Sequence, residues 1–136
     1  MSDFEMPYFD DGQGNRGFFI DPTARTVKDI TSQCSVDTTK VNEFKAFTIG
    51  KLLYISLQTN NTVRDQNTIV TGLPNIYGIG SGYGVLSMFF MNGTDANTNA
   101  TCVVANGSTS ARIEFRCGSN PTGGGGINFS GMFIMR

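Results

Sequence analysis

The chain has 136 residues and a formal net charge of −1, and it contains no histidine. This length predicts one domain with a short appendage. The near-neutral charge offers no electrostatic footprint for nucleic acid or an anionic membrane, so neither is expected as a partner. The lack of histidine excludes Ser-His-Asp and Cys-His catalysis and removes the commonest zinc ligand. We therefore expect a protein that is not an enzyme and that needs no metal or cofactor.

Charged residues make up 15% of the chain, well below the roughly 25% of an ordinary soluble domain. Gly, Thr, Asn and Ser take their place, a composition typical of extracellular or particle-borne proteins. No apolar run follows Met1, which predicts synthesis in a cytoplasm without a signal peptide. The cysteines are odd in number, and free thiols are expected at Cys34, Cys102 and Cys117.

Residues 1–20 differ from the rest of the chain because acids and aromatics are interleaved there without any sustained period. This pattern predicts an extended arm whose aromatic rings dock on its own domain or on a partner. Its acids are Asp3, Glu5, Asp10 and Asp11, and its aromatics are Phe4, Tyr8, Phe9, Phe18 and Phe19.

A short helix is predicted over about residues 22–33. Asp21 and Pro22 have the chemistry of a helix N-cap and first helical position. The apolar residues that follow are spaced three to four apart, at Ala24, Val27, Ile30 and Cys34. The chain thus divides into an attachment segment, 1–40, and a head domain, 41–136.

From residue 41 onward the chain is a succession of short strands separated by Gly, Asn and Pro turns. Strands are predicted over 44–49, 52–59 and 66–70, with a Gly50-Lys51 turn between the first two and Pro74 shortly after the third. This pattern predicts an all-β protein, an antiparallel β-sandwich with a short N-terminal arm.

Two further strands, 84–91 and 126–135, are apolar on both faces. An antiparallel strand normally turns one face to the core and the other to water. A strand that is apolar on both faces must be covered twice, most simply by another copy of the chain. We expect an oligomer with an interface that includes Met88, Phe90, Met132 and Ile134.

Asn106-Gly107 is a signal for a type I′ hairpin turn. A two-residue turn pairs Cys102 with Ala111 and Ala100 with Ile113, and in this register a Cys102–Cys117 disulfide is excluded. The inner face is predicted to hold Ala100, Cys102, Val104, Ala111, Ile113 and Phe115, and the outer face Asn99, Thr101, Arg112 and Glu114.

A sugar site is suggested by the Gly-rich loop 75–84 and the residues that follow it. Aromatic faces stack on pyranose rings, and Asn and Asp side chains hydrogen-bond hydroxyl groups. The candidate ligands are Asn75, Tyr77, Tyr83, Asn92 and Asp95. Ordinary loop packing is the alternative, and it is favoured for each of these residues taken singly.

Three segments carry a resemblance to a known family: FTIGKLLYIS at 47–56, TGLP at 71–74 and INFSGMFI at 127–134. Together they resemble the C-terminal domains of bacteriophage tail, baseplate and head-fibre proteins. The resemblance covers residues 44–136, although Phe44 stands where that family often has Trp. It implies a jelly-roll or tumour-necrosis-factor-like sandwich that is trimeric and often binds host surface glycans.

The function expected from this resemblance is that of a non-enzymatic virion protein, made in the host cytoplasm. It would be the receptor-binding or capping head domain of a tail or head fibre, with the arm inserted into other virion proteins. One alternative is a purely structural decoration or connector protein of the virion. A weaker alternative is a cellular carbohydrate-binding module.

Overall fold

The computed structural model describes residues 8–10, 16–18, 26–79, 82–91, 100–117 and 126–136. The described residues form an all-β, antiparallel fold, as predicted. The strands are β1 (Tyr8–Asp10), β2 (Arg16–Phe18), β3 (Val27–Asp29), β4 (Ser35–Val36), β5 (Val41–Ile49), β6 (Leu52–Thr59), β7 (Thr68–Leu73), β8 (Tyr83–Met91), β9 (Thr101–Ala105), β10 (Ala111–Arg116) and β11 (Ile127–Ile134).

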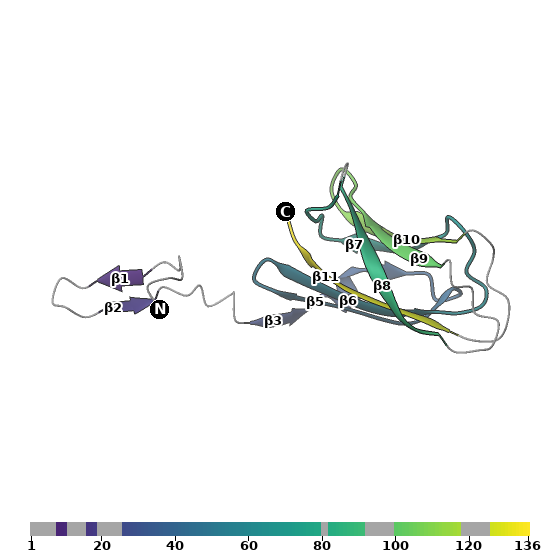
Figure 1. The fold of residues 1–136 in the computed structure, drawn as a ribbon, viewed down its shortest axis with the longest axis horizontal. Helices are drawn as coiled ribbons and strands as arrows, with labels where there is room; N and C mark the ends of the chain where they lie inside the picture. Colours follow the sequence, from purple (N-terminus) through teal and green to yellow (C-terminus); the bar gives the residue numbers. More distant parts are fainter. Residues whose placement is uncertain (1–7, 11–15, 19–25, 80–81, 92–99, 118–125) are drawn as a thin grey trace.

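Nine of these strands form one sheet in the order β3-β5-β6-β11-β8-β9-β10-β7-β4, and β1 and β2 form a separate two-stranded sheet. The large sheet curls into a half-barrel, and β8 runs obliquely between its two halves (Figure 1). Strands β3 and β4 come from the segment 1–40 that we assigned to attachment, yet they form the two edges of this sheet.

The helix predicted over 22–33 is wrong across its described part. Val27–Asp29 is strand β3, which pairs with β5, and the only helical turn among the described residues is the 3-10 helix η2 (Thr31–Gln33). The edge of β5 offers backbone groups that a strand can pair with, and the Ile30 amide donates to the Ala46 carbonyl at 3.0 Å. Ile30, the residue after β3, is buried in the core, whereas Val27 is exposed. The three-to-four spacing of the apolar residues therefore does not mark one face of a helix. Pairing with the sheet outweighs a weak local helix propensity.

The β5–β6 hairpin follows the prediction closely. The turn lies at Gly50, whose φ of 54° suits glycine. Along β6, Leu53, Ile55 and Leu57 are buried, while the residues between them face outward. This alternation is that of a half-buried strand.

Strand β7 extends three residues beyond the predicted end at 70. Ala111 pairs with Leu73 and Arg112 with Thr71, so Gly72 is the extra residue of a β-bulge. Its φ of +86° is a conformation that glycine adopts readily. The bulge lets the strand continue as far as Leu73, directly before Pro74.

The predicted register of the β9–β10 hairpin is wrong by four residues. Cys102 pairs with Phe115 and Ala105 with Arg112, and neither Asn106 nor Gly107 has the positive φ of a type I′ turn. The predicted inner face is nevertheless confirmed, because a shift by an even number keeps every side chain on its side of the sheet. Those inner residues are all buried: Ala100, Cys102, Val104, Ala111, Ile113 and Phe115.

The core fills the concave side of the curled sheet and joins its two halves. Phe115 of β10 and Phe129 of β11 are fully buried, and their rings meet edge to face with centroids 6.2 Å apart. Half-buried Met88 and Phe133 pack against this core. The inner face of the sheet is therefore covered within one chain.

Gly84 is predicted to be intolerant of a side chain. A Cβ there would lie 2.5 Å from Cε1 of Phe133 and 2.7 Å from Cδ1 of Ile76. Gly84→Ala should lower the free energy of unfolding by about 1–3 kcal/mol, since an overpacked core must shift its neighbours. Urea denaturation measures the change, and Ser87→Ala, at an exposed position of the same strand, is the matched control. Equal stability of the two variants would contradict the packing described at Gly84.

Candidate functional surface

The outer side of the sheet carries two apolar rows that cross several strands. Residues paired directly across neighbouring antiparallel strands lie on the same face. One row runs Val27, Ile49, Leu52 and Ile134, and the next runs Phe47, Tyr54 and Met132. The rings of Phe47 and Tyr54 stack with centroids 6.4 Å apart.

Strand β8 adds two residues to this side of the sheet. Its ladder with β11 ends where Ser130 pairs with Ser87. Val85 and Tyr83 lie two and four residues before Ser87, so they share its face of the strand, and both are exposed. We define the outer apolar face as Val27, Phe47, Ile49, Leu52, Tyr54, Tyr83, Val85, Met132 and Ile134. The next row, at Lys45, Ser56, Ser130 and Ser87, is polar and forms its boundary.

The outer apolar face is open to solvent within one chain. The side chains of Met132, Val85 and Ile134 are 61%, 56% and 54% exposed. Soluble monomers rarely expose a contiguous apolar patch of this kind, and a large patch marks an interaction site.

The loop that follows β7 joins this face at one end. The Tyr77 amide donates to the Ile134 carbonyl at 2.8 Å, and Ile79 and Tyr83 exchange backbone hydrogen bonds of 2.7 and 3.3 Å. Tyr77 and Ile79 are 66% and 84% exposed. Tyr77, which we predicted to bind sugar, therefore lies next to Ile134, which we predicted for the oligomer interface. Tyr83 pairs with Ile79 of the same loop.

Two asparagines hold this loop against the β9–β10 hairpin. The carboxamide of Asn106 accepts from the Ile76 amide at 2.8 Å and donates to the Ile76 carbonyl at 2.6 Å. The carboxamide of Asn75 makes the reciprocal pair with Gly107, at 3.1 and 3.0 Å. Asn75, a predicted sugar ligand, thus already uses both the oxygen and the nitrogen of its carboxamide in hydrogen bonds within the fold.

The other predicted interface and ligand residues occupy different places. Met88 pairs with Phe129 and packs against the core, so it lies on the inner face. Phe90 pairs with Asn128, and its side chain lies outside the described residues. Asn92 and Asp95 also lie outside them, as do Phe4 and Phe19 of the arm.

The arm aromatics are described at the backbone only. Tyr8 pairs with Phe18, and Phe9 with Gly17, in the β1–β2 hairpin.

The prediction did not include Leu52, Tyr54, Val85 or Ile79 as surface contacts. Alternation along each strand could have placed the first three on an outer face, but only the strand register shows that they are neighbours.

Glu114, predicted for the solvent face, is buried instead. Its carboxylate forms ion pairs with two guanidinium groups, at 2.8 Å to Nη2 of Arg116 and at 3.5 Å to Nε of Arg112. The two arginines remain partly exposed and cover the acid. The three residues therefore form a compensated ionic row along β10.

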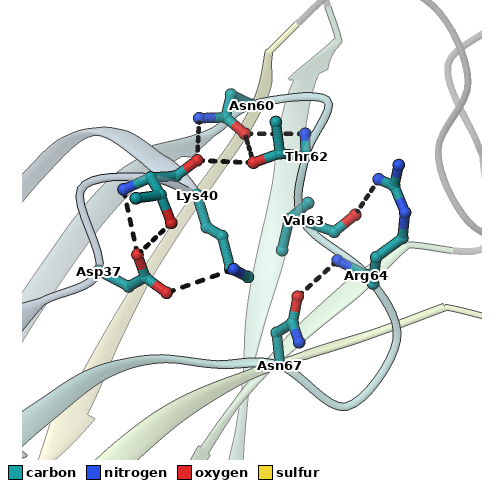
Figure 2. Close-up of polar contacts among 8 residues, drawn as sticks. Asp37, Lys40, Asn60, Thr62, Val63, Arg64 and Asn67 are labelled. Carbon is teal, nitrogen blue, oxygen red and sulfur yellow. Dashed lines mark hydrogen bonds and ion pairs between the residues drawn. The ribbon is translucent and has the colours of Figure 1, made fainter.

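A polar cluster at another part of the sheet serves the loops that contain it (Figure 2). The Asp37 carboxylate accepts the hydroxyl and amide of Thr39 at 2.5 and 3.0 Å, and these bonds, the hydroxyl first, hold its pKa below the usual range. Arg64 donates to the carbonyls of Asn61 and Val63. These donors and acceptors shape turns, which gives the cluster a structural role.

The three cysteines are free thiols. Burial raises the pKa of the Cys102 thiol and that of the Cys34 thiol. It also raises the pKa of Cys117, with a further contribution from Asp65. The nucleophile in cysteine chemistry is the thiolate, and each of these shifts disfavours it. Among the described residues, no group of three or more Cys, Asp or Glu is placed to hold a metal ion.

Comparison with protein-family models, with curated proteins and with solved structures finds no match to this chain. No helix within the described residues is long and apolar enough to cross a bilayer.

Proposed function

We propose that this protein is a non-enzymatic structural component of a bacteriophage particle. In this proposal it forms a homotrimeric head domain, a β-sandwich of the jelly-roll type, that caps a tail or head fibre. The proposal combines an assembly surface with the family resemblance of three sequence segments.

The outer apolar face carries the assembly part of the proposal. With Tyr77 and Ile79, its exposed side chains offer on the order of 1,000 Å² of apolar surface, against roughly 300–600 Å² for the largest patch of a typical monomer. A standard protein interface buries about 800 Å² on each partner. The exposed surface is therefore large enough to support a stable oligomer.

The resemblance supports placement in a virion. Two of the three segments that carry it lie in the β5–β6 hairpin and in β11, and β6 pairs with β11 from Leu52 to Thr59. The same strands provide Leu52, Tyr54, Met132 and Ile134 of the outer face. The segments that carry the resemblance thus supply much of the surface to which we assign assembly.

Glycan binding is the second candidate function, and the exposure of Tyr77 and Tyr83 favours it. The ring of Tyr77, on the loop, and that of Tyr83, at the start of β8, offer faces for stacking on a sugar. The neighbouring Ile79 is apolar, and the Asn75 carboxamide is engaged with Gly107. For these reasons we rank a capping or decorating role above capture of a host receptor.

The oligomer is predicted to have three times the mass of one chain. Ile134→Lys should convert it to single chains, because the exposed site tolerates a lysine in a monomer whereas a buried interface does not. Light scattering coupled to gel filtration measures the mass. Thr109→Lys, on the exposed β9–β10 connection, is the control and should stay trimeric. A monomeric wild-type protein at micromolar concentration would overturn the proposed assembly.

Binding to host cells is predicted to depend on the two tyrosines if the glycan candidate is right. Replacing Tyr77 and Tyr83 with Ala should then abolish binding of the purified protein to cells without lowering its melting temperature by more than a few degrees. Because both residues also belong to the assembly surface, binding is compared at a concentration at which light scattering gives the variant and the wild-type protein the same mass. Thr109→Ala is the matched control. Undiminished binding by the double variant would remove the glycan candidate and leave the capping role.

A further inference from the structure

The outer apolar face needs an occupant. Seven of its nine residues are exposed, and Phe47 and Ile49 are half-buried. In the assembled protein, a cover must come from the same face of another copy or from a different segment. Charge distinguishes between these possibilities.

The end of the face near the Tyr77 loop is basic. Lys51 and Arg136 are exposed. The Lys51 carbonyl accepts the Met135 amide at 2.8 Å, and the Arg136 amide donates to the Asn75 carbonyl at 3.0 Å, so both residues border Ile134. Among the acids of the described body, Asp29 borders the face at its β3 edge, where it pairs with Phe47. Asp37, Glu43, Asp65 and Glu114 lie outside its rows.

Two such faces packed with their basic ends together would bring like charges close to one another. In a two-fold interface the same patch faces itself, so the basic ends would have to be kept apart or would repel. A partner that is both apolar and acidic fits the surface better.

The N-terminal arm has this chemistry. Residues 1–21 contain five aromatics and five acids but only one base, Arg16. The arm enters the sheet at β3, and Val27 of β3 is itself the first member of an apolar row. A two-stranded hairpin such as β1–β2 is marginally stable unless it packs against something.

The arm is long enough to reach a neighbouring copy. Phe18 and Val27 are nine positions apart in the sequence, a stretch that spans up to about 30 Å when extended. The five strands that carry the outer face, from β3 to β8, are together roughly 20 Å wide. A neighbour that stands beside β3 is therefore within reach.

We infer that the arm of one copy docks on the outer apolar face of the next copy, with its aromatic rings over Tyr54, Met132 and Ile134 and its acids toward Lys51 and Arg136. Each copy gives one arm and receives one, and a head-to-tail exchange of this kind closes into a ring when the rotation allows it. The inference rests on the proposed self-association and is independent of placement in a virion. In this inference the partner of the arm is another copy of this protein and not a different virion protein.

Cross-linking of the full-length protein tests this arm exchange. A photoreactive residue introduced as Phe9→p-benzoylphenylalanine is mixed with ¹⁵N-labelled wild-type chains, allowed to exchange and irradiated. Mass spectrometry should then find products that join a labelled and an unlabelled chain, with the link in 52–54 or 132–134. The same photoreactive residue at Asn61, an exposed position in the loop after β6, is the control and should give no such link.

A charge variant provides a second measurement on a folded protein. Lys51→Glu lies in an exposed turn, and it should lower the yield of inter-chain links from position 9 several-fold at low ionic strength. The inference would be overturned by links from position 9 that stay within one chain or that lie only outside the outer apolar face. In that case a trimeric mass would still support the proposed function. A monomeric wild-type protein would overturn both.

Discussion

The position of β11 between β6 and β8 determines where the apolar residues of this protein go. β11 alternates large apolar side chains on both sides toward its end, so each of its faces needs a cover. On the inner face, Ile127 and Phe129 are buried in the core. On the outer face, Met132 and Ile134 complete rows begun by Tyr54 and Leu52. A slip of one residue would exchange the two faces and expose the core, so the same ladder fixes both the core and the outer apolar face.

Strand β8 allows one sheet to enclose the core. It pairs with β9 through its first half, Tyr83–Leu86, and with β11 through its second half, Ser87–Met91. A register shift lies between Asn128 and Phe129, where Phe89 is the unpaired residue on β8. Bulges bend and twist a strand, and the missing side chain at Gly84 makes room for the Phe133 ring. The curvature that covers the inner face leaves the outer face without a cover.

Alternation in the sequence predicted the faces of the strands more reliably than their partners. Leu53, Ile55 and Leu57 were placed on one side of β6, and Ile113 and Phe115 on the inner side of β10. Each of these assignments is confirmed because burial depends on the two-residue period alone. Register depends on distant contacts. The Asn106 side chain bonds to Ile76, thirty residues away, and this contact outweighs the local preference of Asn-Gly for a tight turn.

The candidate surface could be predicted only in part for the same reason. Met132 and Ile134 were identified because they make a short strand apolar on both faces. Tyr54 looked like a member of a polar face in the sequence, and Val85 stood in a strand whose neighbours were unknown. That they share one side of the sheet follows from the strand order β6-β11-β8, which no local pattern specifies. The helix predicted near Val27 failed similarly, because an open edge of β5 is not visible in a local sequence.

The central claim is that the outer apolar face is covered in the assembled protein, and Met132 reports on this most directly. Its side chain is 61% exposed in one chain, and an exposed methionine thioether is readily oxidised to the sulfoxide. Peptide mass spectrometry after brief peroxide treatment measures the rate at Met132, with half-buried Met88 as the internal reference. The account predicts slow oxidation of Met132 in the concentrated wild-type protein and fast oxidation in the Ile134→Lys monomer. Equally fast oxidation in both proteins would show that the face is open in solution and would contradict the account.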